Sequence, residues 1–312
     1  MPGPVAPGAG GYCEAMQPPV LAIFGPTGVG KTALAHALAD RLRARGEHPV
    51  AVSADALQVY AGLETLTGAA DAADRARLEH RLVSFVPITQ TYSAGAYAHR
   101  AHAEIDALLA AGARVIVVGG TGLYLRAALA DLDLRPPVDE AIRARWSRRL
   151  AEEGPAALHA ELRRRDASLA ERIAPADAHR LVRTLELLDA GQTPPGPGDT
   201  QLWTTQTRHP TRLIGLTMDR PALAAAVDAR VDAMLAAGVL DEVRAADAAG
   251  ASATARKALG FADLLAGDVA AMKTRTRRYT KRQLTWMRKL PGVELVDVTG
   301  RTADDVAAQL LP

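Results

Sequence analysis

The sequence predicts an α/β fold in which a doubly wound parallel sheet carries a helical insertion. Six short runs typical of strands recur along the 312 residues, and helical stretches separate most of them. Most runs are apolar on both faces, as in parallel strands that helices cover on each side. The predicted strands are Val20 to Phe24, Pro49 to Ser53, Leu82 to Val86, Arg114 to Val118, Leu213 to Met218 and Val293 to Val298.

A long stretch without any strand pattern interrupts this alternation. From Asp139 to Ala190 the sequence contains only helical segments rich in Ala, Leu and Arg. Pro and Gly residues mark both flanks, at Arg135 to Pro137 and at Gly191 to Gly198, and such flanks are typical of hinges. The predicted division is a disordered tail at residues 1–17, a core at residues 18–135 and 200–312, and a helical insertion at residues 136–199.

The overall composition excludes several classes of protein. A hydrophobic content of 48% is enough for a substantial core, and a net charge of +2 does not by itself indicate a partner. The single cysteine, Cys13, excludes a disulfide framework and a cysteine-based zinc site, and indicates a reducing compartment. Because no apolar run is long enough to span a bilayer and the N-terminus does not resemble a signal peptide, we expect a cytoplasmic protein without membrane contact.

The first predicted strand runs directly into a phosphate-binding loop. The segment G-P-T-G-V-G-K-T matches the pattern G-x-x-x-x-G-K-[ST], and a helical segment from Ala33 to Arg45 follows it. Backbone N–H groups of such a loop surround phosphate oxygens, while Lys31 adds positive charge and Thr32 offers a hydroxyl to Mg²⁺. A simple glycine-rich turn is the alternative. The residues expected to hold a polyphosphate are Gly25, Pro26, Thr27, Gly28, Val29, Gly30, Lys31 and Thr32.

Two polar residues follow predicted strands at the edge of the sheet where ligands of open α/β folds bind. Asp55 follows the second strand and is a candidate base or metal ligand, whereas Thr121 follows the fourth and is a candidate partner of a reacting group. A helix cap is the alternative for both. The fourth strand ends in Gly119-Gly120-Thr121, where ATPases and GTPases carry an acidic residue for Mg²⁺, so ordinary nucleotide hydrolysis is disfavoured. These glycines should let a substrate approach the backbone closely.

A basic segment near the C-terminus is a candidate surface for a polyanion. Eight Lys or Arg residues and no acidic residue lie between Lys273 and Lys289. Leu284, Met287 and Leu290 share one helical face, which leaves the basic residues on the remainder of the helix to contact phosphates. A basic face that is merely solvated is the alternative.

Five motifs occur in the order seen in one family of enzymes. They are the phosphate loop, Asp55-x-x-Gln58-Val59-Tyr60, Val118-Gly119-Gly120-Thr121-Gly122-Leu123-Tyr124, Arg180-x-x-Arg183-x-x-Glu186 and Lys281-Arg282-Gln283-x-Thr285-Trp286. In this order the chain resembles the tRNA dimethylallyltransferases, which modify an adenosine beside the anticodon. No cysteine follows Val298, so the resemblance is to the bacterial type, which lacks the zinc finger of eukaryotic relatives. The sequence departs from the usual pattern at Ala56, at Leu57, at Leu66 to Ala70 and at His80-Arg81-Leu82.

The resemblance implies a reaction and roles for individual residues. With Mg²⁺, the phosphate loop would hold dimethylallyl diphosphate, whose dimethylallyl group would pass to the exocyclic amine (N6) of the adenosine. Asp55 would accept the proton, Thr121 would contact the base, and Lys31 and Arg220 would approach the diphosphate. The insertion and the core would grip the tRNA between them. The matching tRNA-contact positions are Asp55, Ala56, Leu57, Gln58, Thr121, Arg143, Arg180, Arg183, Arg256, Lys257, Gly260, Lys281 and Arg282.

Three other interpretations fit part of the sequence. A small-molecule kinase with a phosphate loop would release ADP, and the Gly-Gly-Thr strand end argues against it. An adenylate isopentenyltransferase would share the core but manage without an RNA-binding insertion. A non-catalytic RNA-binding module would leave Lys31, Thr32 and Asp55 without a purpose. For the proposed enzyme we expect a monomer whose partners are tRNA and dimethylallyl diphosphate.

Overall fold

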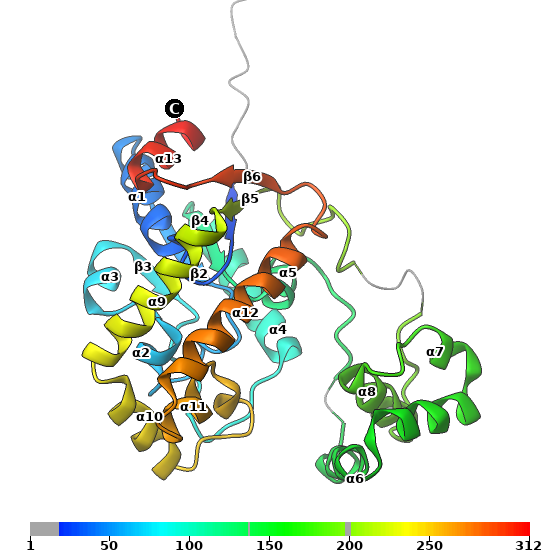
Figure 1. Ribbon diagram of the computed structural model, residues 1–312. Helices are drawn as coiled ribbons and strands as arrows, with labels where there is room; N and C mark the ends of the chain where they lie inside the picture. Colours follow the sequence, from blue (N-terminus) through cyan, green and yellow to red (C-terminus); the bar gives the residue numbers. More distant parts are fainter. Residues whose placement is uncertain (1–18, 137, 197–200) are drawn as a thin grey trace, which may run out of the picture.

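A six-stranded sheet lies at the centre of the chain, in a computed structural model that describes residues 19–136, 138–196 and 201–312 (Figure 1). All paired strands are parallel, in the order β3-β2-β4-β1-β5-β6. The strands are β1 (Val20–Phe24), β2 (Pro49–Ser53), β3 (Glu79–Arg81), β4 (Arg114–Gly119), β5 (Thr211–Thr217) and β6 (Glu294–Asp297). The doubly wound α/β core is therefore confirmed, whereas the predicted tail, Cys13, Pro137 and Pro197 lie outside the described residues.

Helices cover both faces of the sheet and divide its side chains between two apolar clusters. Along β1, Leu21 and Ile23 join one cluster while Ala22 and Phe24 join the other, because successive side chains of a strand point to opposite faces. The first cluster includes α1 (Lys31–Ala44) and α13 (Ala303–Leu310). The second includes α4 (Ala94–Ala110), α5 (Gly122–Leu129), α9 (Arg220–Ala236), α10 (Val239–Ala248), α11 (Phe261–Leu265) and α12 (Val269–Met287). Short elements α2 (Glu64–Thr67), α3 (Ala72–Arg77) and η1 (Ala255–Lys257) lie in the connections.

The edge strand β3 corrects one prediction. It covers Glu79–Arg81 and not residues 82–86, because Leu82 and Ser84 adopt left-handed φ values of 59° and 52° that break the extended backbone. Leu82 and Val86 lie in a loop that buries their apolar side chains in the core. An isolated β-bridge to Tyr60 is the only strand-like pairing of Val86 among the described residues. The residues that do pair in β3 are polar and partly exposed at the sheet edge. The apolar run at residues 82–86 therefore belongs to a buried loop and not to a strand.

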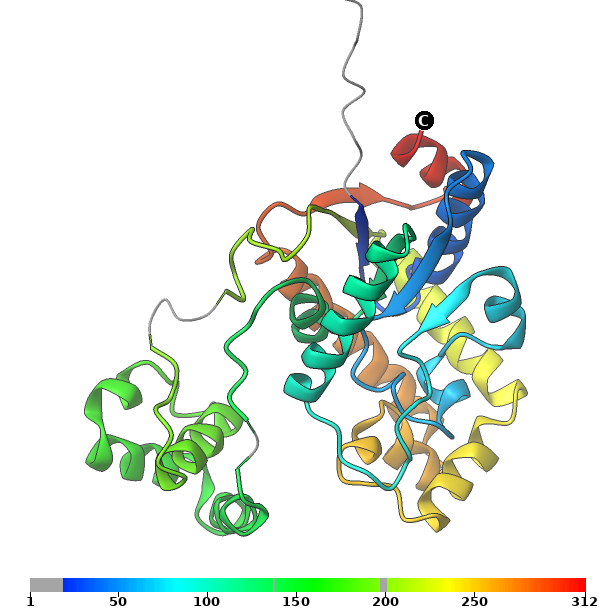
Figure 2. The same cartoon turned by 180° about the vertical axis from the view of Figure 1, so that it is seen from behind.

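The stretch without strands forms three helices that lie apart from the sheet (Figures 1 and 2). They are α6 (Glu140–Arg165), α7 (Ala167–Glu171) and α8 (Ala178–Asp189). Gly154, at φ 77°, breaks α6 just before Pro155 into two helical pieces. Trp146, Leu158 and Leu185 are buried in an apolar cluster that these helices share with one another, so the insertion helices bury apolar surface independently of the sheet.

Within the described ranges, no helix combines the length and the apolar character that crossing a membrane requires.

Candidate active site

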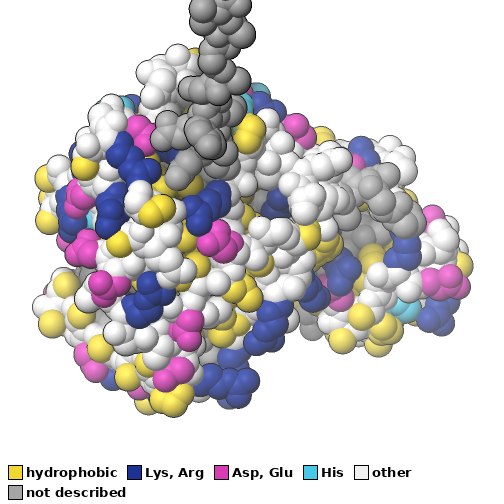
Figure 3. Space-filling view, turned by 90° about the horizontal axis from the view of Figure 1, so that it is seen from above, with side chains coloured by type: hydrophobic (Ala, Val, Ile, Leu, Met, Phe, Trp, Pro, Cys, Tyr) yellow, Lys and Arg dark blue, Asp and Glu magenta, His cyan; other side chains and the backbone are white. Residues whose placement is uncertain are grey.

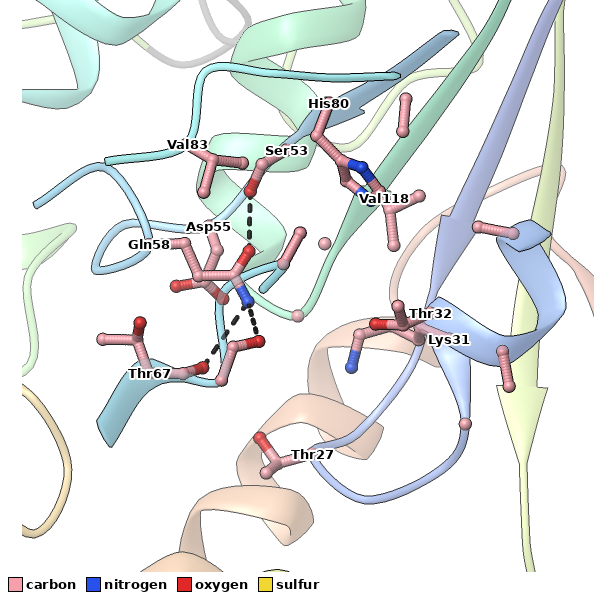
Figure 4. A pocket seen from close by; sticks show the side chains of 18 of the residues that line it. Thr27, Lys31, Thr32, Ser53, Asp55, Gln58, Thr67, His80, Val83 and Val118 are labelled. Atoms are coloured by element: carbon pink, nitrogen blue, oxygen red, sulfur yellow. Dashed lines mark hydrogen bonds between the residues drawn. The ribbon is translucent and has the colours of Figure 1, made fainter. Parts of the chain in front are cut away.

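The carboxyl edge of the sheet surrounds a cavity of about 310 Å³. Lys31 and Thr32 line it from the start of α1, while Asp55 and Gln58 face them from the segment after β2 (Figure 4). The ends of parallel strands meet at this edge, which is why segments far apart in the sequence share one cavity. His80, which precedes the departure at Arg81, also borders it.

The phosphate loop is shaped by two glycines and held closed by a lysine. Gly28 and Gly30 have φ values of 87° and 94°, a left-handed conformation that favours glycine. The Nζ of Lys31 donates hydrogen bonds to the carbonyl oxygens of Gly25 and Pro26, each 3.0 Å long. Burial lowers the pKa of Lys31 to about 8, while attraction to Asp55 opposes the shift and repulsion from Arg230 adds to it. An anion in the cavity would therefore meet a cation that has little water around it.

Asp55 and Thr121 meet across the ends of β2 and β4. The Thr121 hydroxyl donates to Asp55 Oδ2 over 3.3 Å, and the other carboxylate oxygen accepts the backbone N–H of Leu57 at 3.0 Å. Thr121 precedes α5, but its side chain makes no capping hydrogen bond to that helix. The Thr121 hydroxyl is thus directed to the carboxylate and not to a helix end, while Asp55 also stabilises a local turn.

Gly119 and Gly120, at the end of β4, have protein atoms where a Cβ atom would lie, and both also border the cavity, so the close approach of a substrate to them stays a prediction. A Cβ atom on Gly119 would lie 2.2 Å from the carbonyl oxygen of Ala54, and one on Gly120 would lie 2.6 Å from Gln283 Nε2. Either contact is shorter than van der Waals packing allows. Glycine is required here so that the end of β2 and the helix α12 can approach β4 closely.

Gln283 joins the two halves of the cavity wall. Its Oε1 accepts the backbone N–H of Thr27 at 2.9 Å, and its Nε2 donates to the carbonyl oxygen of Gly120 at 2.8 Å. The side chain is only 4% exposed, so water cannot replace either hydrogen bond readily. Sequence reasoning gave roles to Lys281 and Arg282 but none to Gln283, although Gln283 shares the buried helical face of Met287.

Arg230 is the second functional candidate that the sequence did not reveal. Its Nη2 donates to the carbonyl oxygen of Thr67 at 3.1 Å, and its guanidinium lies where Gly68 would carry a Cβ atom. Burial lowers the pKa of Arg230, with attraction to Asp55 opposing the shift. Arg220 begins the same helix but is exposed, and the residues that border the cavity do not include it. Ten residues place Arg230 about 15 Å further along the helix axis.

A second cavity of about 170 Å³ lies beside the first and shares Thr27, Asp55, Thr67 and Arg230 with it. Apolar side chains supply part of its wall, and cationic and hydroxyl side chains supply another part. These residues are Leu57, Leu66, Met234, Leu259, Met272, Lys257, Arg282, Thr276 and Tyr279. The second cavity therefore joins Asp55 to three other predicted RNA contacts, Leu57, Lys257 and Arg282.

The other predicted tRNA contacts on the core differ in how far hydrogen bonds and ion pairs within the protein already occupy their side chains. The Oε1 of Gln58 accepts from the Ser53 hydroxyl at 2.8 Å and its Nε2 donates to Gly68, so Gln58 braces the cavity wall. Arg256 donates to the carbonyl oxygen of Ala251 and pairs with Asp247. Further members of the predicted set are Ala56, which packs on the core, Gly260, at φ 94° against Met272, and Lys281, which is exposed.

Three predicted contacts of the insertion lie in a groove of about 630 Å³ between the insertion and the core. Arg143, Arg180 and Arg183 border it together with Arg135 and Arg172, and the core contributes Gly95, Leu134 and Trp203. Figure 3 shows Lys and Arg side chains along the side of the core that faces the insertion. Five arginines and one acidic residue, Asp133, thus border the groove, and this excess of positive charge is compatible with a surface for nucleic acid.

The segment that returns from the insertion is fixed to the core beside Thr121. Buried Arg126 donates to the carbonyl oxygens of Gln201, at 2.7 Å, and Gln206, at 3.0 Å. Trp203 packs against Trp286 of α12 with ring centroids 4.6 Å apart and the ring planes inclined by 42°, and Trp286 occupies the space where Gly122 would carry a Cβ atom. The backbone next to Thr121 is thereby in contact with the returning segment through two aromatic rings.

Comparison with known proteins identifies the family. The pattern of the IPP transferase family matches residues 58–290. The tRNA dimethylallyltransferase of Thermobifida fusca is 41% identical over 285 residues, 88% of each chain, and that of Mycobacterium avium is 38% identical over 291 residues, 89% of this chain and 93% of the relative. The crystal structure of a tRNA isopentenylpyrophosphate transferase from Bacillus halodurans matches with a TM-score of 0.66 and 29% identity over 94% of both chains. The chain therefore belongs to the tRNA dimethylallyltransferase family of IPP transferases.

Proposed function

We propose that this protein transfers a dimethylallyl group from dimethylallyl diphosphate to N6 of an adenosine adjacent to the anticodon of tRNA. Relatives at about 40% identity carry the name of this activity. The observation that supports it most directly is the position of Asp55, which faces the phosphate loop across the first cavity and accepts a hydrogen bond from Thr121. A base and an anion-binding loop are the two parts that such a transfer needs.

The donor diphosphate binds at the phosphate loop. Its oxygens accept hydrogen bonds from loop N–H groups. Lys31 gives up its hydrogen bonds to the carbonyl oxygens of Gly25 and Pro26 and donates to phosphate oxygens instead. Arg230 supplies the second cation in place of Arg220, because Arg230 borders the cavity and Arg220 does not. Both cations stabilise the negative charge that grows on the diphosphate as it leaves.

The side chains around the loop fit a Mg²⁺ ion that is bound mainly through the donor. The Thr32 side chain borders the cavity with Asp55 opposite, and the described residues contain no cluster of three acidic or histidine side chains that could hold a metal ion. Mg²⁺ commonly takes one or two protein ligands and completes its shell with phosphate oxygens and water. When bound with the diphosphate, this ion neutralises charge on the leaving group.

Asp55 takes the proton that the transfer releases. As the bond between N6 and the first carbon of the dimethylallyl group forms, the bond between that carbon and the diphosphate oxygen breaks. The amine becomes acidic as it bonds to carbon, and the proton passes to a carboxylate oxygen of Asp55. The Thr121 hydroxyl, 3.3 Å from Oδ2, orients this carboxylate and contacts the base.

The adenosine reaches Asp55 through the second cavity, because Lys257 and Arg282 border it and Asp55 forms part of its wall. The base must leave the anticodon stack, which costs a few kcal/mol. Phosphate contacts from Lys281 and Arg282 on α12, from Arg256, and from Arg143 and Arg180 in the groove offset that cost. A tRNA substrate also implies that the protein works in the cytoplasm.

Mass spectrometry of nucleosides tests the proposed function. Unmodified tRNA incubated with the protein, Mg²⁺ and dimethylallyl diphosphate should acquire one five-carbon group on a single adenosine of the anticodon loop. Free AMP serves as the competing acceptor and labelled ATP as the competing donor. Faster modification of AMP than of tRNA would indicate an adenylate isopentenyltransferase, and phosphoryl transfer from ATP at a comparable rate would indicate a kinase.

A further inference from the structure

The guanidinium of Arg183 is engaged on two sides within the protein. Its Nη2 donates to the carbonyl oxygens of Arg135, at 2.9 Å, and Pro136, at 2.8 Å. Its Nη1 donates to Glu186 Oε2 at 3.3 Å. Both N–H groups of Nη2 and one of Nη1 are thus occupied. Few N–H donors of the guanidinium are left to bind a phosphate in a bidentate manner.

Glu186 explains why this arrangement is stable. The carboxylate is 3% exposed, and its second oxygen accepts from Arg143 Nε at 3.4 Å. A buried carboxylate is costly unless cations and hydrogen bonds surround it, and removing one partner leaves the other charge uncompensated. The hydrogen bonds to Glu186 and to the linker carbonyls use N–H groups that Arg183 would otherwise offer to an RNA phosphate, which makes Arg183 a poor phosphate contact.

The contacts of Arg183 join the incoming connection of the insertion to its last helix. Arg135 and Pro136 belong to the linker that leads from the core into α6, whereas Arg183 and Glu186 belong to α8, the last helix before the chain returns. The incoming linker is therefore fastened to the outgoing helix. This contact ties the incoming linker to the body of the insertion, and it limits the angles that the insertion can adopt against the core.

We infer that Arg183 and Glu186 form a linker clip that orients the insertion, and that Arg183 is a positioning residue and not a phosphate contact. The consequence for tRNA rests on the proposed function. With the clip intact, the cationic groove and the catalytic cavity are presented to one tRNA at a fixed separation. Without it, tRNA must order the insertion as it binds, and its affinity falls.

The Arg183→Lys variant separates the positioning role from a role as phosphate contact. It keeps the positive charge but loses the planar guanidinium that donates several hydrogen bonds at once. We expect the KM for tRNA to rise roughly tenfold, because the tRNA-binding groups of the insertion are no longer held in place, while kcat changes less. The dependence of tRNA affinity on salt should keep its slope, since no phosphate contact is lost. Glu186→Gln should act in the same direction as Arg183→Lys. The matched control is Arg180→Ala, whose side chain is 67% exposed and should change the salt slope instead.

A distance measurement makes the clip testable without tRNA. Spin labels at two exposed positions, Ala44→Cys on α1 and Glu152→Cys on α6, report the separation of core and insertion in a Cys13→Ser background. Arg183→Lys and Glu186→Gln should broaden the distance distribution, and Arg180→Ala should leave it unchanged. Unchanged donor binding shows that the core remains folded.

Two results would overturn the clip. One is an unchanged distance distribution in both clip variants. The other is normal tRNA affinity for Arg183→Lys combined with tighter binding by Glu186→Gln, which is what a phosphate contact relieved of a nearby carboxylate would show. If the wild-type protein fails to modify tRNA, the proposed function fails, but the distance measurement still decides whether the clip exists.

Discussion

Lys31 and Arg230 border the catalytic cavity with little water around them, and burial lowers the pKa of both. In the insertion, by contrast, Arg180 is 67% exposed and pairs with Asp177 on the surface. Buried cations keep most of their attraction for an anion at any salt concentration, whereas exposed cations are screened within about 10 Å at 0.1 M salt. Under the proposed function, the same type of charge therefore has two uses: a fixed one for chemistry at the sheet edge and a salt-dependent one for binding a long polyanion.

The strongest test of this contrast is at Asp55. Asp55→Asn should lower single-turnover transfer by about two to four orders of magnitude, the usual scale for loss of a general base, while tRNA affinity changes far less. Rapid-quench assays at saturating tRNA, with filter binding in parallel, measure the two effects separately. Normal transfer at saturation combined with poor tRNA binding would make Asp55 a binding residue.

The two arginines of α9 test which cation reaches the diphosphate. Arg230→Ala should weaken donor binding roughly ten- to a hundredfold, since a charge-assisted hydrogen bond is lost in a site with little water. Arg220→Ala is the matched control on the same helix and should change the donor Kd little. The opposite ranking by calorimetry would restore the sequence-based assignment of Arg220.

The pH dependence of donor binding tests Lys31. As the pH rises through about 8, Lys31 of the ligand-free protein loses its proton, so donor affinity should fall above that pH, by up to about tenfold per pH unit. The unfolded chain keeps this proton up to about pH 10.4, so the Lys31 contribution to the free energy of unfolding should instead rise between pH 8 and 10. Lys31→Ala binds the donor weakly and should lose the step near pH 8. An identical step in that variant would assign the titration to another group.

The smallest effect should be at the exposed arginines. Arg180→Ala should weaken tRNA binding only a few-fold at moderate salt, and it should reduce the slope of log affinity against log salt by about one unit. Donor affinity should not change. A slope equal to that of the wild type would remove Arg180 from the RNA surface.

The sequence was informative where a function depends on consecutive residues. The phosphate loop, Asp55 and Thr121 each follow a strand directly, so the order of strands was enough to bring them to one edge. Gln283 and Arg230 were missed because each is a single polar residue on a helix, and its hydrogen-bond partners lie 163 or 256 residues away in the sequence. The strand β3 was missed because its polar residues pair at an exposed edge while the apolar residues beside it fill a loop.

The three tryptophans give this protein a natural pair of optical reporters. Trp146 is buried in the insertion with its Nε1 donating to Asp189, so its emission responds to the folding of α6 and α8. Trp203, 39% exposed, and Trp286 pack against each other beside Thr121, where exciton coupling between their rings should give a circular dichroism signal sensitive to their separation. Titrations followed at both signals would show whether tRNA reaches the insertion or the linker first, with no label attached.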